Sequence, residues 1–322
     1  MRTLFPGVVV CLTVAAAAQF LASHYEAPQM LFALLLGMAF HFLSEEKASA
    51  PGVEFSARIV LRIGVALLGL RITFSDIAGL GPANVLLVST GVFATILFGV
   101  LLATLFRKKI GFGILTGGAV AICGASAALA ISSILPKSKD SERNTIFTVV
   151  AVTTFSTIAM IVYPVLAIAL GHGDKTAGIF LGATIHDVAQ VVGAGYTISS
   201  EAGDVATVTK LFRVALLVPV VLLLSLFFRG RQSYSNRFPL PLFVVGFCLL
   251  AGINSWGVLP GVVQSWLIDL SRWCLVTAIA ALGIKTSLKT LSTIGYQAVG
   301  LIVAETVFIA AWVLVGMAYL AQ

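Results

Sequence analysis

Three polar residues that could do chemistry lie close together inside a long apolar stretch of this sequence. They are His186, Asp187 and Gln190, and Gly193 and Gly195 follow them. A charged group at the centre of a bilayer costs at least about 2.5–3.5 kcal/mol, so each of these residues needs a reason to be there. On a helix, Gln190 is four residues from His186 and three from Asp187, which places all three on one side. This cluster predicts a polar cavity; the alternative is a buried network that holds two helices together.

A second stretch, residues 113–133, is apolar enough to span a membrane but consists largely of small residues. Thirteen of its 21 residues are Gly, Ala or Ser, and Cys123, Gly124, Ala125 and Ser126 lie near its middle. Gly costs a helix about 1 kcal/mol relative to Ala, and small side chains allow other groups to approach the backbone closely. The pattern predicts a membrane helix that is interrupted at mid-depth, with its broken ends facing a binding site.

The composition defines the class of protein. The mean hydropathy is +1.06, 59% of the residues are hydrophobic and 10% are charged. Soluble domains carry about 25% charged residues, so the chain is expected to be an integral membrane protein. Its net charge of +7 is no evidence for nucleic-acid binding, because Lys and Arg mark the cytoplasmic loops of such a protein.

Apolar segments of about 20 residues recur along the whole chain, and no long linker separates them. We expect a single membrane domain over residues 1–322, with an all-α polytopic fold, about 10–11 transmembrane helices, internal repeats and one or two broken helices. A basic residue and an apolar run at the start resemble a signal peptide, but the many later spans favour an uncleaved first span. The eleven candidate spans are at about 5–23, 27–43, 60–80, 82–106, 110–135, 145–170, 176–199, 205–228, 238–254, 262–284 and 295–320.

The distribution of basic residues predicts the orientation. If all eleven segments cross and the N-terminus is cytoplasmic, 13 of the 20 Lys and Arg residues fall on the cytoplasmic side and the other seven fall outside. Cytoplasmic loops carry the excess of basic residues, so we expect a cytoplasmic N-terminus.

Internal similarity predicts repeats, which many transporter folds contain. Residues 68–71 (Leu-Gly-Leu-Arg) resemble residues 282–285 (Leu-Gly-Ile-Lys), and eleven crossings put these two on opposite sides, as an inverted repeat requires. Residues 118–126 and 182–190 also resemble each other, but the same count makes both run in one direction. Three explanations stay open: one segment is re-entrant, the count is off by one, or the similarity is only one of composition.

Other charged residues also lie inside apolar segments. Lys210 and Arg213, near the start of the eighth segment, either snorkel to the surface or supply positive potential to an anion path. Glu305 lies near the centre of the last segment without a local cation, so it serves proton coupling or a structural hydrogen bond. Asp269 and Arg272, three residues apart, predict a local ion pair.

An enzyme is not expected. Cys123, His186 and Asp187 are the ingredients of a thiol hydrolase triad. His186 and Asp187 are neighbours, however, so on a helix they point about 100° apart and the aspartate cannot easily orient the histidine. No spacing typical of a metal site is present, and neither a metal nor another cofactor is expected.

Several of these segments together resemble a known family. Residues 122–127 (Ile-Cys-Gly-Ala-Ser-Ala) and 186–194 (His-Asp-Val-Ala-Gln-Val-Val-Gly-Ala), with residues 68–71 and 210–213, are similar to the YeiH-type family of bacterial inner-membrane proteins, described as sulfate exporters. The resemblance extends over most of the chain. It implies a multi-pass plasma-membrane transporter, with a crossed pair of broken helices as in the bile-acid and sodium–proton transporter folds.

Our leading hypothesis is a secondary transporter for a small anion, sulfate or an organic sulfonate. The N-terminus of a half-helix near residues 124–126 would offer backbone N–H groups and a positive dipole end. The sequence lacks a Walker A motif, so ATP is not expected to drive transport directly. The predicted substrate-binding residues are Cys123, Gly124, Ala125, Ser126, His186, Asp187, Gln190, Lys210 and Arg213.

Three residues are candidates for coupling to protons or sodium: Asp187, His186 and Glu305. The alternative function is an anion channel or a membrane ligand sensor. A membrane-embedded thiol enzyme is a further, less favoured alternative. The lipid bilayer and a small anion are the expected partners. The sequence leaves open the substrate, the direction of transport, the coupling ion and a homo-oligomer.

Overall fold

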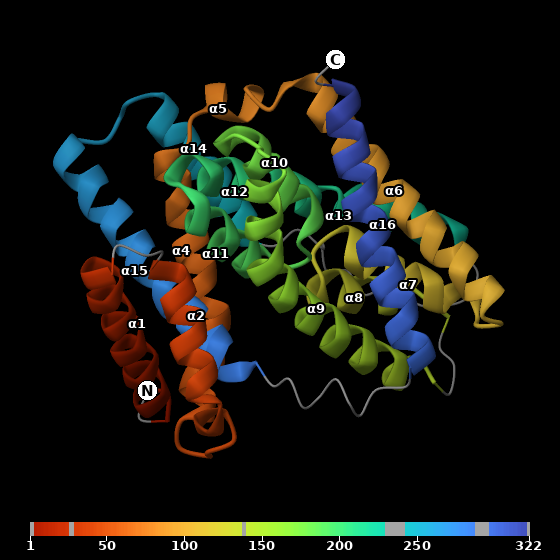
Figure 1. The fold of residues 1–322 in the computed structure, drawn as a ribbon, viewed down its shortest axis with the longest axis horizontal. Helices are drawn as coiled ribbons and strands as arrows, with labels where there is room; N and C mark the ends of the chain where they lie inside the picture. Colours follow the sequence, from red (N-terminus) through yellow and green to blue (C-terminus); the bar gives the residue numbers. More distant parts are fainter. Residues whose placement is uncertain (1–2, 26–28, 137–139, 229–241, 287–295, 321–322) are drawn as a thin grey trace.

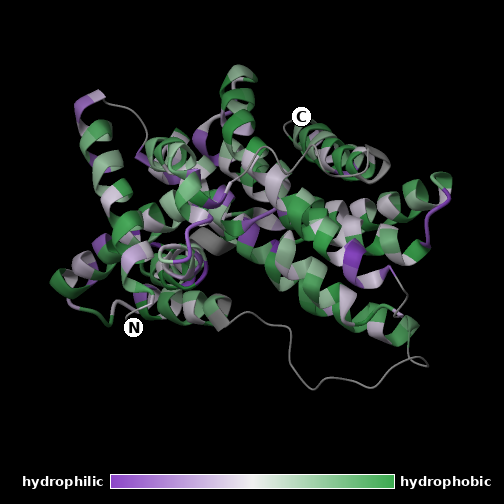
Figure 2. Cartoon of the chain, turned by 90° about the horizontal axis from the view of Figure 1, so that it is seen from below, coloured by the Kyte–Doolittle hydropathy of each residue, from purple (hydrophilic) through white to green (hydrophobic). Residues whose placement is uncertain are grey.

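The computed structural model describes all residues except 1–2, 26–28, 137–139, 229–241, 287–295 and 321–322. The described residues form helices and no strands, so the prediction of an all-α polytopic membrane protein is confirmed. Six helical segments are long and apolar enough to cross a bilayer, and hydrophobic residues cover much of their length (Figure 2). They are α1 (Phe5–Tyr25), α6 (Gly81–Leu105), α9 (Ser141–Ala169), α12 (Ser200–Ala215) with α13 (Leu217–Phe227), α15 (Gly261–Lys285) and α16 (Tyr296–Leu320).

Shorter helices make up the rest of the described chain. Helix α3 (Ala50–Phe55) continues without a break into the π-helical turn Ser56–Val60, and then into α4 (Leu61–Leu68) and the 3₁₀ turn Gly69–Arg71. The shorter helices are α2 (Gln29–Ala39), α3 (Ala50–Phe55), α4 (Leu61–Leu68), α5 (Phe74–Ala78), α7 (Ile110–Ala121), α8 (Ala125–Ser132), α10 (Asp174–Thr184), α11 (Val188–Ile198) and α14 (Leu242–Ser255).

The helices form two groups that lie side by side (Figure 1). The first group contains α1–α4, α14 and α15, and the second contains α6–α13 and α16. Within the first group, α2 and α15 approach closely because Gly37 faces Gly283: a Cβ atom on Gly283 would lie 2.9 Å from the Gly37 Cα. The two groups meet where α11 packs against α2 and α15.

The segment 110–135 turns back on itself instead of crossing the molecule. Gly118 of α7 faces Ile131 of α8 so closely that a Cβ atom would overlap the isoleucine side chain, and Gly111 faces Leu135 at 3.8 Å. In one continuous helix, residues 118 and 131 would be about 20 Å apart at 1.5 Å per residue. α7 and α8 are therefore antiparallel, and we call them hairpin A, with tip A at residues 122–124.

The segment 174–198 forms a second hairpin. α10 runs parallel to α12, because a Cβ atom on Gly178 would lie 2.8 Å from the Val205 Cβ and one on Gly182 would lie 2.7 Å from the Thr209 Cβ. Only Ser199 separates the end of α11 from the start of α12, and the chain reverses there. α11 therefore runs in the opposite direction to α12. α10 and α11 are therefore antiparallel. We call them hairpin B, with tip B at residues 185–187.

The two hairpins enter the molecule from opposite faces, as their contacts with α9 show. Near the start of α9, Phe147 packs against Phe112 at the base of hairpin A, with ring centroids 6.2 Å apart. Near the end of α9, Tyr163 packs against Phe180 of hairpin B, with centroids 5.4 Å apart. Hairpins A and B are therefore an inverted pair, which resolves the conflict in direction between the two similar sequences.

This arrangement corrects two expectations. Segments 110–135 and 176–199 do not each cross the membrane; both are interrupted, as predicted, but both are re-entrant. The crossed pair of broken helices implied by the family resemblance is replaced by two hairpins that meet tip to tip. Hydropathy reports the length of an apolar segment but not a reversal of the chain within it, which explains the error.

Candidate functional site

Tips A and B are in contact inside the second helix group. A Cβ atom on Gly124 would lie 3.7 Å from the His186 carbonyl oxygen and 3.7 Å from the Val152 side chain of α9. Gly124 has φ +60° and ψ −121°. A residue with a Cβ atom would be strained in this conformation, whereas glycine adopts it readily. Glycine at this position therefore permits both the chain reversal and the close approach of the tips.

Lys210 of α12 joins the two tips and is completely buried. Its Nζ donates to the carbonyl oxygen of Ile122 in tip A at 2.6 Å and to that of Ile185 in tip B at 2.8 Å. A single ammonium group thus bonds both hairpins at the point where their helices stop.

Arg213, one turn further along α12 and also completely buried, makes a wider connection. Its Nε and Nη2 donate to Val120 and Ala121 of hairpin A at 2.6–3.0 Å. Its Nη1 donates to Gly182 and Ile185 of hairpin B, both at 2.9 Å. We call Lys210 and Arg213 together the clamp.

The clamp solves a problem that helix ends create inside a membrane. An α-helix leaves its last carbonyl groups without partners, and these are the groups that the clamp binds at the ends of α7 and α10. Each such group without a partner in hydrocarbon costs several kcal/mol, and a cation also matches the negative end of the helix dipole. The snorkelling explanation for Lys210 and Arg213 is therefore wrong, because both point inward. Their contact with a substrate stays a prediction.

The two remaining helix ends at the tips, the N-termini of α8 and α11, differ from each other. Asp187 caps α11: its carboxylate accepts from the Ala189 N–H at 3.0 Å, and its own N–H donates to Ser156 Oγ of α9 at 3.0 Å. α8 begins at Ala125 without a side-chain cap. The positive end of α11 is thus matched by a carboxylate, whereas that of α8 is not matched by a side chain.

Tip B and the first turn of α11 carry two buried polar side chains, each with one polar atom that makes no hydrogen bond to the described residues. His186 Nε2 lies 2.9 Å from Thr306 Oγ1 of α16, and the Gln190 amide donates to Thr157 Oγ1 of α9 at 3.5 Å. Among the described residues, His186 Nδ1 and Gln190 Oε1 have no hydrogen-bond partner. Buried polar atoms without partners are rare, so these two atoms mark a place where a ligand or a proton can bind.

Glu305, next to Thr306 on α16, is completely buried. Its Oε1 accepts from Thr116 Oγ1 of α7 at 2.8 Å, while Oε2 has no partner among the described residues. A Cβ atom on Gly99 of α6 would overlap Glu305 Oε1, so glycine at this position leaves the room that the carboxyl group occupies. Within the described part of the chain, no basic side chain forms an ion pair with it. α16 therefore contacts hairpin A through Glu305 and tip B through Thr306.

The structure brings most of the predicted site residues together, with one exception. Cys123, Gly124, His186 and Gln190 are all buried where the tips meet, and Asp187 and Ala125 are half-buried. Ser126 is exposed on α8, so its hydroxyl does not share the buried space around His186.

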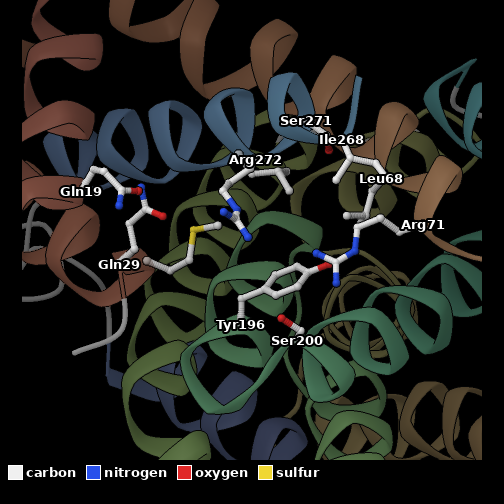
Figure 3. A pocket seen from close by; sticks show the side chains of 11 residues that line it. Gln19, Gln29, Leu68, Arg71, Tyr196, Ser200, Ile268, Ser271 and Arg272 are labelled. Atoms are coloured by element: carbon white, nitrogen blue, oxygen red, sulfur yellow. The ribbon is translucent and has the colours of Figure 1, made fainter. Parts of the chain in front are cut away.

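Sequence reasoning missed a cavity of about 260 Å³ between the two helix groups (Figure 3). Five helices and one turn contribute to its polar lining, and this dispersal along the chain hides it. The only sequence signals were two arginines inside apolar segments. Its polar lining includes Gln19, Gln29, Arg71 and Arg272 from the first group and Tyr196 and Ser200 from the second.

The predicted ion pair between Asp269 and Arg272 is wrong. Among the described residues, no carboxylate lies within 4 Å of the Arg272 guanidinium, which points into the cavity towards Tyr196 (Figure 3). The helical spacing of three residues allows a pair, but the cavity offers the arginine another direction.

Replacing Arg213 by Lys should destabilise the protein although the charge is kept. The guanidinium fork bonds four carbonyl groups, whereas an ammonium has three donors on a single nitrogen and cannot bond all of them. Each buried carbonyl left without a partner costs about 1–3 kcal/mol. We expect the free energy of unfolding to fall by about 2 kcal/mol or more, measured by thermal unfolding in detergent. The matched control is Arg143→Lys, on an exposed arginine of α9. Equal unfolding temperatures for Arg213→Lys and wild type would contradict the clamp.

Comparison with known proteins identifies the family. The family model described as conserved hypothetical protein 698 matches residues 6–302. A UPF0324 membrane protein of Chlorobaculum tepidum is 56% identical over 96% of this chain and 88% of its own length. The UPF0324 membrane protein TauZ of Paracoccus denitrificans is 53% identical over 97% of this chain and 94% of its own length. The resemblance to the YeiH-type family is thus confirmed, and the chain belongs to the UPF0324 family of membrane proteins.

Proposed function

We propose that this protein is a secondary transporter that moves a small anion, such as sulfate or an organic sulfonate, across the bacterial plasma membrane. The observation that carries the proposal is the meeting of tips A and B inside the molecule. Non-helical backbone at membrane depth is tolerated where it is buried in protein or lines a cavity. Transporters build substrate and ion sites near the bilayer midplane from such discontinuous helices.

The charges around the tips support an anionic substrate. The clamp contributes two buried cations, and Asp187 contributes one anion where it caps α11. The N-terminus of α8, at Ala125 and Ser126, has no side-chain cap and is the end at which backbone N–H groups can bind an anion. Cys123 and Gly124 lie beside this end, and Gln190 adds an amide on the side of hairpin B.

Three groups support coupling to protons or sodium. Asp187 is a carboxylate at tip B, His186 has an unpaired ring nitrogen, and Glu305 has an unpaired oxygen within the described residues. A proton or a cation bound to one of them would change the charge near the tips and hence the affinity for an anion.

The basic residues still support a cytoplasmic N-terminus once the hairpins are re-entrant. The re-entrant arrangement moves Arg143 to the face of the N-terminus and Lys175 to the opposite face, compared with eleven crossings. Loops and helix ends with an excess of Lys and Arg are cytoplasmic. With this order of crossings, the described basic residues toward the N-terminal face include Lys47, Arg58, Arg107, Lys108, Lys109, Arg143 and Lys285, and those toward the other face include Arg71, Lys175 and Arg272.

Reconstitution tests the proposal directly. The purified protein in liposomes should take up radiolabelled sulfate or methanesulfonate faster than empty liposomes do, with saturation. An imposed gradient of protons or of sodium should change the rate. If neither gradient changes flux for any anion of a broad screen, coupled transport is wrong. Sustained current without saturation would indicate a channel instead, and binding without flux would indicate a sensor.

Replacing Glu305 by Gln tests its role as a coupling residue. The amide oxygen can still accept from Thr116, so the protein should fold with an unfolding temperature close to that of wild type. The amide cannot take up or release a proton, so we expect flux down the anion gradient to persist while its response to a pH gradient falls at least about tenfold. The matched control is Glu142→Gln, at an exposed position of α9. An unchanged response to the pH gradient would exclude Glu305 from coupling.

A further inference from the structure

We infer that the cavity between the two helix groups is a binding site for a small monovalent oxyanion, held between Arg71 and Arg272. This site is separate from the tips. The inference rests on the proposed function in one respect: the bound anion is a transported substrate only if the protein is a transporter. Binding itself depends on the geometry and charge of the cavity.

Arg71 is held in place from the second helix group. Its Nη2 lies 3.1 Å from Asp204 Oδ2 of α12, and its Cζ lies 5.6 Å from the centre of the Tyr196 ring of α11. The Tyr196 hydroxyl donates to the other oxygen of Asp204. The guanidinium is thus fixed by an ion pair and a cation–π contact, and Asp204 balances its charge.

Arg272 approaches from the other side, on α15. Figure 3 shows its guanidinium directed towards Tyr196, with Arg71 beyond the ring. No carboxylate of the described residues lies within 4 Å of it. Arg71 and Arg272 are the charged residues that line the cavity. With Asp204 counted against Arg71, the site has one cation in excess, which matches a ligand with a single negative charge.

The neutral lining and the size narrow the class of ligand. Gln29 brings an amide group and Ser200 a hydroxyl, while the Gln19 amide donates one of its two N–H groups to Ser23 Oγ at 3.2 Å. Ser271 already donates to the Gly64 carbonyl at 2.7 Å, so it is not available as a donor. The planar guanidinium fork suits the oxygens of a carboxylate or sulfonate. The volume, about 260 Å³, lies below the range of about 300–1,000 Å³ for pockets that hold drug-sized ligands, so the ligand is small.

The cavity lies at the junction of the two helix groups. Arg272 belongs to the first helix group, whereas Tyr196 and Ser200 belong to the second. An anion bound here would contact both groups at their junction. Because α11 connects the cavity to tip B, the site lies at one end of a helix whose other end is in the predicted transport site.

Binding to the purified full-length protein in detergent tests the inference, with methanesulfonate, acetate and sulfate as probes. We expect methanesulfonate or acetate to bind more tightly than sulfate. Arg272→Gln should weaken the binding about tenfold or more, because it removes a charge-assisted hydrogen bond and the excess charge. Arg272→Lys should retain part of the affinity. Arg272 is exposed, so we expect both variants to unfold at the temperature of wild type.

The control is Arg143→Gln, which removes an exposed arginine from a helix that does not line the cavity and should leave binding unchanged. Wild-type affinity in Arg272→Gln, or failure of all three probes to bind to wild type, would overturn the inference. Flux of the same probes into liposomes separates it from the proposed function. Binding that requires Arg272 in a protein without flux supports the site and contradicts transport, whereas flux in a protein whose binding is unchanged by Arg272→Gln supports transport and contradicts the site.

Discussion

Two buried cations hold the ends of two helices together inside this protein. Lys210 and Arg213 satisfy carbonyl groups of α7 and α10 that a membrane offers no water to bind. Without them, neither hairpin could stop at mid-depth at an acceptable free energy. The chain reversals at Gly124 and Asp187, the contact between the tips and the burial of His186 all depend on this clamp.

The clamp also determines which helix ends at the tips can contact a ligand. It occupies both helix C-termini at the tips, so the N-termini of α8 and α11 are left. Asp187 caps one of these with its own carboxylate, and the other has no side-chain cap. The pair is therefore inverted in topology but unequal in charge. One end offers backbone N–H groups without a side-chain cap and the other holds a carboxylate, an asymmetry that the proposed coupling of an anion to a proton or cation would use.

Much of this could be predicted from the sequence, and the exceptions have physical reasons. The glycines near Cys123 and the polar residues at 186–190 identified both interruptions, because each departs from the pattern of an ordinary membrane helix. The reversal of the chain was not predictable from hydropathy, since an apolar segment of 20 residues reads the same whether it crosses or returns. The role of Lys210 and Arg213 was not predictable either, because their partners are backbone carbonyls, which leave no trace in side-chain chemistry. The cavity at Arg71 and Arg272 depends on residues far apart in the chain, which only the packing brings together.

The sidedness of the hairpin bases tests the central claim most directly. Single cysteines at the exposed positions Lys109, Asp140, Asp174 and Glu201 can be labelled from either face of sealed vesicles, in a chain whose four native cysteines are replaced by alanine. The two-hairpin fold predicts that positions 109 and 140 react from one face and positions 174 and 201 from the other. Labelling of positions 109 and 140 from opposite faces would show that the first interrupted segment crosses the membrane, and would contradict the meeting of two opposed hairpins.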